Sequence, residues 1–372
     1  HLEAREVPVE PFQRVRVLGR ELDAAAVRAA AAAAQHLYDT PEWFTVERAA
    51  GTDPRLAWAI SDSGQVAYAT LTASRPSDPA WPYARPDLLL PELAASDTPA
   101  DGLMPAVLIG GRRPGHSSIV IPSGSPDTHG VAADLLSVIT EHAHETGASS
   151  LVAPFVDHAT GTHLARAVGS PSLRVRAGRG WTLRLPGTGF KDWLASLAKK
   201  ARVNERATIR RLELFHELDF EARPLQADDI DWMVPLELAL YGRHGNDYGA
   251  GPARQLHEAY LDVLGDQTWV ITATADGAPV GFASFIQHGD RAWIRQVGVA
   301  PGWEMSQVYF GVAYHGAIRL AYDLGVHSLD YSITADDAKR RRGAHSRELF
   351  SLITPLGRTH LTLRPGYPPV FA

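Results

Sequence analysis

Apolar and polar positions alternate through the C-terminal third of the chain in a pattern that predicts three consecutive strands. Two runs, Thr268–Ala273 and Val280–His288, flank an Asp276-Gly277 pair, and a Gly289-Asp290 turn then leads into Ala292–Val299. Asp-Gly between two such runs favours a tight hairpin, because both residues tolerate left-handed backbone angles. We therefore expect an antiparallel meander in this region.

After this meander the apolar positions change to helical spacing. Between Gly311 and Leu324 they recur every three or four residues, and Gly325 stands where a helix commonly ends in a left-handed residue. Val326–Ile333 alternates again and predicts a closing strand. The expected order is three strands, a helix and a strand.

A similar order occurs in the N-terminal half. Leu56–Ser61 and Gln65–Thr72 predict a hairpin, a helix that begins at Gly130 ends at Gly147, and Ser149–Phe155 predicts the next strand. Both helices begin with Gly-Val-Ala. We interpret the repeated order as an internal duplication, the alternative being that two unrelated α/β segments share a common pattern.

The duplication divides the chain into two expected domains. The first covers residues 4–186 and carries a Pro-rich insert at about 75–101, and the second covers residues 187–372. A loop as long as this insert is commonly either a functional flap or a linker segment. The fold class that follows is α/β (α+β), with helices flanking a mixed sheet in each half.

Composition narrows the classes of protein. The 372 residues include no cysteine, which excludes disulfides, thiol nucleophiles and Cys-ligated zinc. The net charge is −6. The chain has no apolar run of membrane-spanning length and no secretory signal pattern, so we expect a cytoplasmic protein.

Basic side chains gather in two segments despite the acidic total. The helical pattern of Phe190–Glu213 carries Lys199, Lys200, Arg202 and Arg206. Lys339–Arg342 is a second, denser run after the closing strand. Clustered Lys and Arg bind phosphate groups independently of base sequence, although such a helix is equally compatible with an ordinary solvated face.

The strand order, with Val297-Gly298-Val299-Ala300-Pro301 before the helix, resembles the core of a GNAT-superfamily acyltransferase. That resemblance implies two GNAT-like halves, each with a splayed mixed sheet. It also implies a glycine-rich turn before the helix that holds the pyrophosphate of coenzyme A. Here the turn from Pro301 to Gly311 carries Trp303 and Glu304 and few glycines. The donor is therefore bound differently, or it is not coenzyme A.

Further segments are similar to the tandem-GNAT family of Fem-type peptidyltransferases and its neighbours, the peptidoglycan-biosynthesis-like N-acyltransferases. They are Phe190-Lys-x-Trp-Leu-x-Ser-Leu-x-x-Lys-x-Arg, Leu240–Gly245, Ser328–Tyr331 and Lys339–Ala344. The family resemblance implies transfer of an aminoacyl group from aminoacyl-tRNA to an amine, forming an amide or peptide bond. The chain lacks an obvious long helical-hairpin insertion, which favours a small molecule or peptide of secondary metabolism as acceptor.

Two other functions stay open from the residues alone. An acyl-CoA-dependent N-acyltransferase would use acyl-CoA as donor substrate, which the unusual turn disfavours. A catalytically inactive GNAT-like module that binds a ligand fits the same turn. No cofactor beyond the donor and no metal ion is expected, since His-Glu-x-x-His and similar patterns are missing from the sequence.

The candidate site residues follow from their predicted positions. We assign the catalytic centre to Asp330, Gln296 and Tyr331, with Asp330 on the polar face of the closing strand, where it can accept a proton or orient an amine. Backbone N–H groups near Gln296–Val299 would polarise the donor carbonyl. The substrate-binding candidates lie in a polar loop, in the unusual turn and in the second basic run: Tyr241, His244, Asp247, Tyr248, Trp303, Lys339 and Arg341. The tRNA-binding candidates are Lys199, Lys200, Arg202 and Arg206.

Overall fold

The computed structural model describes residues 12–18, 25–61, 66–78, 85–89, 100–111, 113–117, 119–120, 128–168, 172–215, 217–245, 248–305 and 307–356. Among these residues the strands form one mixed sheet of thirteen strands. The strands are β1 Phe12–Leu18, β2 Arg55–Ser61, β3 Val66–Ser74, β4 Ala106–Ile109, β5 Ile119–Val120, β6 Ser150–Val156, β7 Leu173–Arg184, β8 Leu218–Pro224, β9 Thr268–Ala275, β10 Ala278–His288, β11 Arg291–Val299, β12 Ser328–Asp330 and β13 His345–Pro355.

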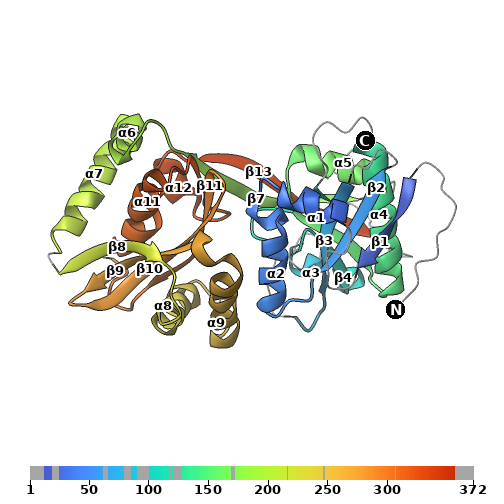
Figure 1. Cartoon of the computed structure of the whole chain (residues 1–372), viewed down its shortest axis with the longest axis horizontal. Helices are drawn as coiled ribbons and strands as arrows, with labels where there is room; N and C mark the ends of the chain where they lie inside the picture. Colours follow the sequence, from blue (N-terminus) through green and yellow to red (C-terminus); the bar gives the residue numbers. More distant parts are fainter. Residues whose placement is uncertain are drawn as a thin grey trace.

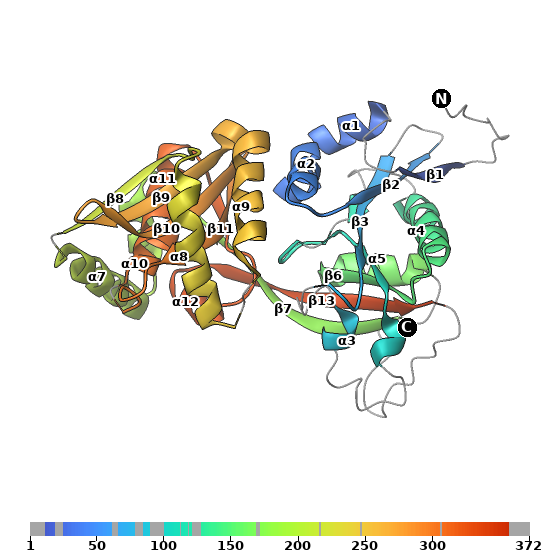
Figure 2. The ribbon, with the colours of Figure 1, turned by 90° about the horizontal axis from the view of Figure 1, so that it is seen from below.

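Helices cover both faces of this sheet (Figures 1 and 2). The α-helices are α1 Ala25–Ala32, α2 Pro41–Ala49, α3 Pro86–Leu89, α4 Thr128–Glu145, α5 His158–Val168, α6 Phe190–Ser196, α7 Lys199–Glu213, α8 Asp229–Arg243, α9 Ala250–Ala259, α10 Val308–Phe310, α11 Ala317–Asp323 and α12 Asp336–Arg341. Short 3₁₀ segments are η1 Leu37–Asp39, η4 Ala100–Leu103 and η6 Gly265–Gln267, and π segments are η5 Tyr260–Leu264 and η7 Gly311–Gly316.

The order of strands in the sheet is symmetric about its centre. It runs β1-β2-β3-β4-β6-β13-β7-β12-β11-β10-β9-β8, with β5 added beside β3. The pairs β4·β6 and β11·β12 are parallel, and the other pairs along the path are antiparallel. The two halves therefore repeat the same strand order and directions, as the duplication predicts.

The last strands of the two halves are exchanged. β7 follows β6 in sequence but pairs with β12, and β13 follows β12 but pairs with β6. β7 and β13 pair with each other and pass between the two lobes in Figure 1. The expectation of a separate sheet in each half is therefore wrong, because the exchange joins them into one. The domain boundary at 186/187 stays a prediction.

The predicted meander is confirmed, whereas the helix after it is more irregular than expected. Asp276 and Gly277 both have positive φ, 49° and 78°, as the hairpin turn requires. The helix starts at Val308, and its middle is the π segment η7. A Cβ on Gly316 would lie 2.5 Å from Ile271 Cγ2. The missing side chain therefore lets the helix pack directly against β9.

Two further expectations change. The basic helix is interrupted at Leu197-Ala198, whose extended backbone separates α6 from α7. The closing strand is short, since only Ser328–Asp330 pairs as β12.

Each half has its own apolar core, one beneath α4 and one around η7 and α11. No helix in the described part of the chain is long and apolar enough to span a membrane.

Candidate active site

Strands β11 and β12 separate after a short stretch of pairing. They pair at three positions, the last being Trp293 opposite Asp330. The chain then leaves β11 but continues along β7, since Tyr331 N donates to Trp181 O and Trp181 N donates to Ser332 O, both at 2.9 Å. Among the described strands, none pairs with this edge of β11 beyond Trp293. A strand edge left open in this way offers backbone N–H groups to a ligand.

The segment that follows β12 holds three residues with unusual backbone angles. Ser332, Thr334 and Ala335 have φ of 56°, 66° and 51°, which cost energy in residues with a side chain. The buried Lys339 ties this loop together, as its Nζ donates to Tyr331 O and Ile333 O at 2.6 Å. Burial lowers the Lys339 pKa to about 8, opposed by the nearby carboxylates. Such strain is typical of functional sites.

Side chains of the C-terminal half bind the backbone of the N-terminal half beside this loop. Ser332 Oγ donates to Pro114 O at 2.9 Å, and Arg347 Nη2 donates to Gly115 O at 3.1 Å. The next residue, His116, places its Nε2 3.1 Å from both carboxylate oxygens of Asp39. The strained loop of one half and a histidine–carboxylate pair of the other thus lie side by side.

A second histidine supports this pair. The His36 ring stacks on His116 with 3.5 Å between centroids and meets the edge of Trp293 at 5.1 Å. Its Nδ1 accepts from Tyr38 N at 3.2 Å. Burial, followed by the charges of His116 and three arginines, holds the His36 pKa well below its ordinary value. His36 is therefore neutral in the folded protein.

The ligand atoms of His36, Asp39 and His116 lie within 4.8 Å of one another, which is close enough for a metal ion. A ligating histidine normally donates its other ring N–H to an acceptor. The Nδ1 of His36 instead accepts a backbone N–H, so Nε2 carries the hydrogen. The positive charges around His36 also oppose a cation. We interpret the group as a hydrogen-bonded pair on a stacked support.

Arg295 joins the two halves beside the open edge of β11. Its Nη1 donates to the hydroxyl of Tyr38, and its Nε donates to Tyr260 Oη at 3.5 Å. The Tyr260 hydroxyl donates in turn to the predicted site residue Gln296, at 3.1 Å. Gln296 is buried within this chain of contacts. The hydrogen bond to its amide therefore helps to hold β11 in place.

The polar loop after α8 is only partly assembled as expected. Tyr241 and Tyr248 meet edge to face at 6.0 Å, and the Tyr248 hydroxyl donates to the buried Glu237. Glu237 Oε2 lies 2.6 Å from His257 Nε2, and burial raises the Glu237 pKa. His244 is exposed at the end of α8. Asp247 lies outside the described residues.

Tyr331 and Trp303 make contacts with other aromatic rings. The Tyr331 ring stacks on Tyr314 at 4.6 Å, and its hydroxyl donates to Ala313 O at 3.1 Å. Trp303 packs against Phe215 at 5.8 Å. Next to Trp303, Glu304 accepts from Gly302 N at 2.8 Å and pairs with Arg243. A carboxylate therefore already accepts a backbone N–H of this turn. In GNAT enzymes that use coenzyme A, the N–H groups of the turn bind the pyrophosphate.

The two basic segments converge on one groove. A cavity of about 470 Å³ lies between α6, the start of α7, the end of β7 and α12. Its lining includes the basic residues Arg184, Arg340, Arg341, Arg342 and His345. Lys199 and Lys200 are exposed on the first turn of α7 beside it, and Arg206 is exposed further along. Arg202 Nη1 instead donates to Ala195 O at 2.7 Å, bridging the break between α6 and α7.

The inner face of α7 is fastened by a buried ionic cluster. Glu205 Oε2 lies 2.8 Å from His315 Nε2, and Glu205 Oε1 lies 3.1 Å from Arg342 Nη2. The Arg342 guanidinium also covers the Phe310 and Tyr314 rings at 3.9 and 4.5 Å. This cluster fixes the basic helix against the helix that follows β11.

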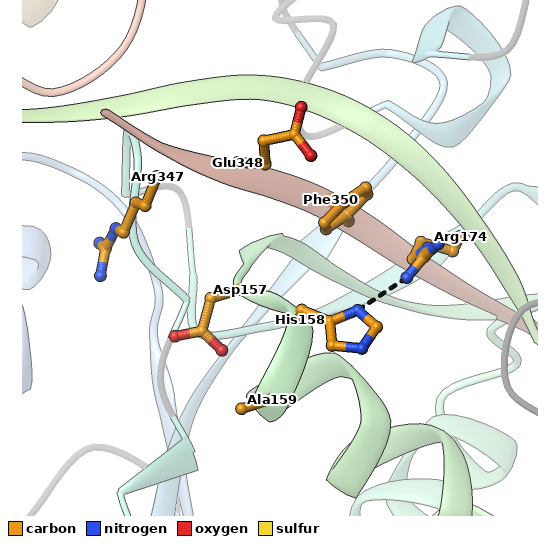
Figure 3. A pocket seen from close by; sticks show the side chains of 7 residues that line it. All are labelled: Asp157, His158, Ala159, Arg174, Arg347, Glu348 and Phe350. Carbon is orange, nitrogen blue, oxygen red and sulfur yellow. Dashed lines mark hydrogen bonds between the residues drawn. The ribbon is translucent and has the colours of Figure 1, made fainter. Parts of the chain in front are cut away.

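A second cavity of about 470 Å³ lies in the N-terminal half between α5 and β13 (Figure 3). Its lining carries both signs of charge, with the acids Asp157 and Glu348 and the bases Arg174 and Arg347. Arg174 Nη1 donates to His158 Nδ1 at 2.9 Å and covers the Phe350 ring at 4.5 Å. Arg347 connects this cavity to the His116 loop through Gly115 O.

Reasoning from the sequence missed the residues that the N-terminal half supplies. Asp39 and His116 are 77 positions apart and share no motif. Glu205 had a usable pattern, since it is an acid in the middle of a basic helix, with Arg202 and Arg206 close to it in sequence. Arg295 and Gln296 likewise interrupt an apolar strand. Polar residues at such positions indicate a buried network.

Comparison with known proteins finds one matching sequence family and several similar folds. Residues 199–340 match the family model described as an acetyltransferase (GNAT) domain. No curated protein matches the chain. The fold is also similar to solved structures of low sequence identity.

Three of these structures cover most of the chain. FemX is 10% identical with a TM-score of 0.59, covering 89% of this chain and 95% of its own. L-PGS from Bacillus licheniformis is 10% identical with a TM-score of 0.53, covering 92% and 94%. A tandem GNAT protein from the clavulanic acid biosynthesis pathway, in a structure without AcCoA, is 14% identical with a TM-score of 0.50, covering 91% and 97%. The chain therefore has a tandem GNAT-like fold, and residues 199–340 in its second half match the model of a GNAT acetyltransferase domain.

Proposed function

We propose that this protein is an amide-forming acyltransferase that moves an aminoacyl group from aminoacyl-tRNA to an amine of a small molecule or peptide. The observation that carries the proposal is the basic groove beside α7 and α12. Two basic segments about 140 residues apart line or border one cavity of about 470 Å³ on the GNAT domain. A polyanionic donor matches this surface better than a small thioester does.

The turn before α10 supports the same donor. In a GNAT enzyme that uses coenzyme A, free backbone N–H groups at this turn bind pyrophosphate. Glu304 here accepts the Gly302 N–H and carries a negative charge at that place. A second anion at this turn would meet repulsion. The Fem-type resemblance of the sequence agrees with an aminoacyl ester as donor.

The open edge of β11 is the proposed place of reaction. The donor ester carbonyl lies along this edge, where backbone N–H groups near Gln296–Val299 polarise it. Asp330, at the point of separation, orients the acceptor amine. Lys339 holds the loop that carries Tyr331 and Ser332, and so keeps the edge open.

The remaining predicted residues surround this edge in the proposal. Tyr241, His244 and Tyr248 border the acceptor, and Trp303 borders the donor. Lys199, Lys200, Arg206 and Arg341 bind phosphates of the donor. Arg202 supports the α6–α7 junction, so its contribution to tRNA binding is indirect.

An acyl-CoA-dependent N-acyltransferase is the second candidate. It is favoured by the description of the matching family as an acetyltransferase domain. The same β11 edge would serve a thioester carbonyl. The occupied turn at Glu304 is the observation that places this candidate second.

The proposal is tested by reversing charge at the groove. Lys199→Glu/Lys200→Glu should lower the rate of amide formation from charged tRNA at least tenfold and reduce the salt dependence by up to about two units of slope. The melting temperature should barely change, because both side chains are exposed.

The matched control is Arg166→Glu/Arg176→Glu, with the same change of net charge on the N-terminal half. This control should keep wild-type rates. Equal loss in both double variants would show that only the net charge matters and would contradict a specific tRNA surface.

A further inference from the structure

A histidine–carboxylate pair of the N-terminal half lies where β11 and β12 separate in the C-terminal half. His116 stacks on His36, and His36 meets Trp293, the last residue of β11 paired with β12. Pro114, two residues before His116, accepts from Ser332 of the strained loop. The pair therefore faces the proposed place of acyl transfer.

The hydrogen bonds of His116 determine which ring nitrogen is available. Both neighbours of Nε2 are carboxylate oxygens of Asp39, which only accept, so Nε2 carries the hydrogen. Nδ1 is then the nitrogen that can hold a lone pair. Among the described residues no partner of Nδ1 is found, and 16% of the side chain is exposed. The ring is therefore not sealed from solvent, as a role toward a substrate amine requires.

Asp39 is held in place from several sides. Its backbone carbonyl accepts from the Tyr68 hydroxyl at 2.8 Å, and Arg113 Nη1 lies 3.8 Å from its carboxylate. Arg113 itself is bound by Glu47 through two bonds of 2.9 Å. The carboxylate therefore keeps a fixed direction toward the imidazole, as in other histidine–carboxylate pairs that act as general bases.

We propose that His116, oriented by Asp39, accepts the proton of the attacking amine. This inference rests on the proposed function. The amine nitrogen forms a bond to the ester carbonyl carbon, and one N–H proton passes to His116 Nδ1. The carbon–oxygen bond to the ribose then breaks, and His116 returns the proton to the departing hydroxyl oxygen. Ester and amine become amide and alcohol, and His116 ends as it began.

The charges around the ring suit a transient proton. Arg113, Arg291 and Arg347 are close enough for their charges to act on His36, and Asp39 is the acid bound to His116. Asp330 faces the same space from β12, near Tyr38. His36 beneath the ring stays neutral and adds no charge. The arginines promote release of the proton, and Asp39 stabilises the charged ring while it lasts.

The second cavity offers room for the acceptor. It is bordered by Arg347, which donates to Gly115 next to His116 (Figure 3). Its acidic residues Asp157 and Glu348 can attract an ammonium group. The amine would then pass from this cavity to His116 and lose its proton there.

The test compares two nucleophiles in His116→Gln and Asp39→Asn. Glycinamide needs a base when it attacks, whereas hydroxylamine needs far less help. With glycinamide, His116→Gln should lower kcat/KM about 10²-fold or more, and hydroxylamine should lose less than about tenfold. Asp39→Asn should show the same selectivity to a smaller extent, and the double variant should be no worse than His116→Gln.

The controls separate a chemical role from a structural one. His288→Gln changes another histidine at the contact between the halves, where it bonds Ala34 O at 2.8 Å, and should keep wild-type rates. Equal loss with both nucleophiles, or no loss, in His116→Gln overturns the proposal. Inactivation by EDTA that zinc reverses would also overturn it, in favour of a metal role.

Each reaction is run in parallel with aminoacyl-tRNA and with acetyl-CoA as donor. If the wild type uses only acetyl-CoA, the proposed donor fails while the comparison of nucleophiles still tests His116. Amide from neither donor overturns both proposals.

Discussion

At the scale of single residues, the protein buries charges where a stable core would avoid them. Lys339 is 4% exposed, and within the described part of the chain its Nζ donates to two carbonyl oxygens. Both lie in the strained loop after β12. Removing an ammonium group from water costs free energy that those two bonds recover only in part. The position of Lys339 thus serves the site rather than stability.

The pKa of Lys339 makes this cost measurable. Its pKa is about 8 in the folded protein and 10.5 in an unfolded chain. Between these values the unfolded chain holds a proton that the folded protein lacks, so stability rises with pH, by up to about 1.4 kcal/mol per unit. Relative to Lys339→Met, the wild type should therefore gain about 1 kcal/mol between pH 7.5 and 9.0.

Urea unfolding at the two pH values measures this gain, with Lys191→Met on the exposed face of α6 as control. A difference between wild type and Lys339→Met that stays constant with pH would contradict a buried, titrating Lys339.

Residue-level prediction from sequence worked where a residue acts within its own segment. Thr40-Pro41 is a common helix start in sequence, and Thr40 Oγ1 accepts from Trp43 N at 3.1 Å where α2 begins. Lys339 was selected because it lies in a basic run, and the structure buries it beside Asp330. His116 could not be found, because its partner Asp39 meets it only after the halves pack.

At the scale of elements, the irregular helix after β11 defines the site. The π segment Gly311–Gly316 buries Tyr314 and His315, which hold Arg342 and Glu205 under the basic helix. Gly316 allows this packing because, without a Cβ, it lets the π segment lie directly against β9. A regular amphipathic helix was expected, because a π turn leaves no periodic pattern in sequence.

Gly316→Ala should be destabilising, since its Cβ would meet Ile271 Cγ2 at 2.5 Å. We expect a loss of about 1–3 kcal/mol in the free energy of unfolding. Gly251→Ala in α9 is the matched control, because nothing lies within 4 Å of its Cβ. It should gain about 0.5–1 kcal/mol. Equal values for the two variants would show that η7 adjusts freely.

At the scale of the whole molecule, the exchange of β7 and β13 brings distant residues together. The repeat of strand order was visible in the sequence because each half carries its own apolar pattern. The exchange was not visible in the sequence. Pairing of β13 (345–355) with β6 (150–156) depends on contacts between residues almost 200 positions apart, and the sequence patterns did not predict β13. The same packing brings the two basic segments to one groove and His116 to the β11 edge.

The central claim is that this assembly takes its acyl group from aminoacyl-tRNA. The most direct measurement is a single reaction of wild-type protein with glycinamide, aminoacyl-tRNA and acetyl-CoA, with the products separated by mass. The account predicts the aminoacyl amide as product, and its disappearance when the tRNA is digested with RNase beforehand. An acetyl amide as the main product, unaffected by RNase, would contradict it.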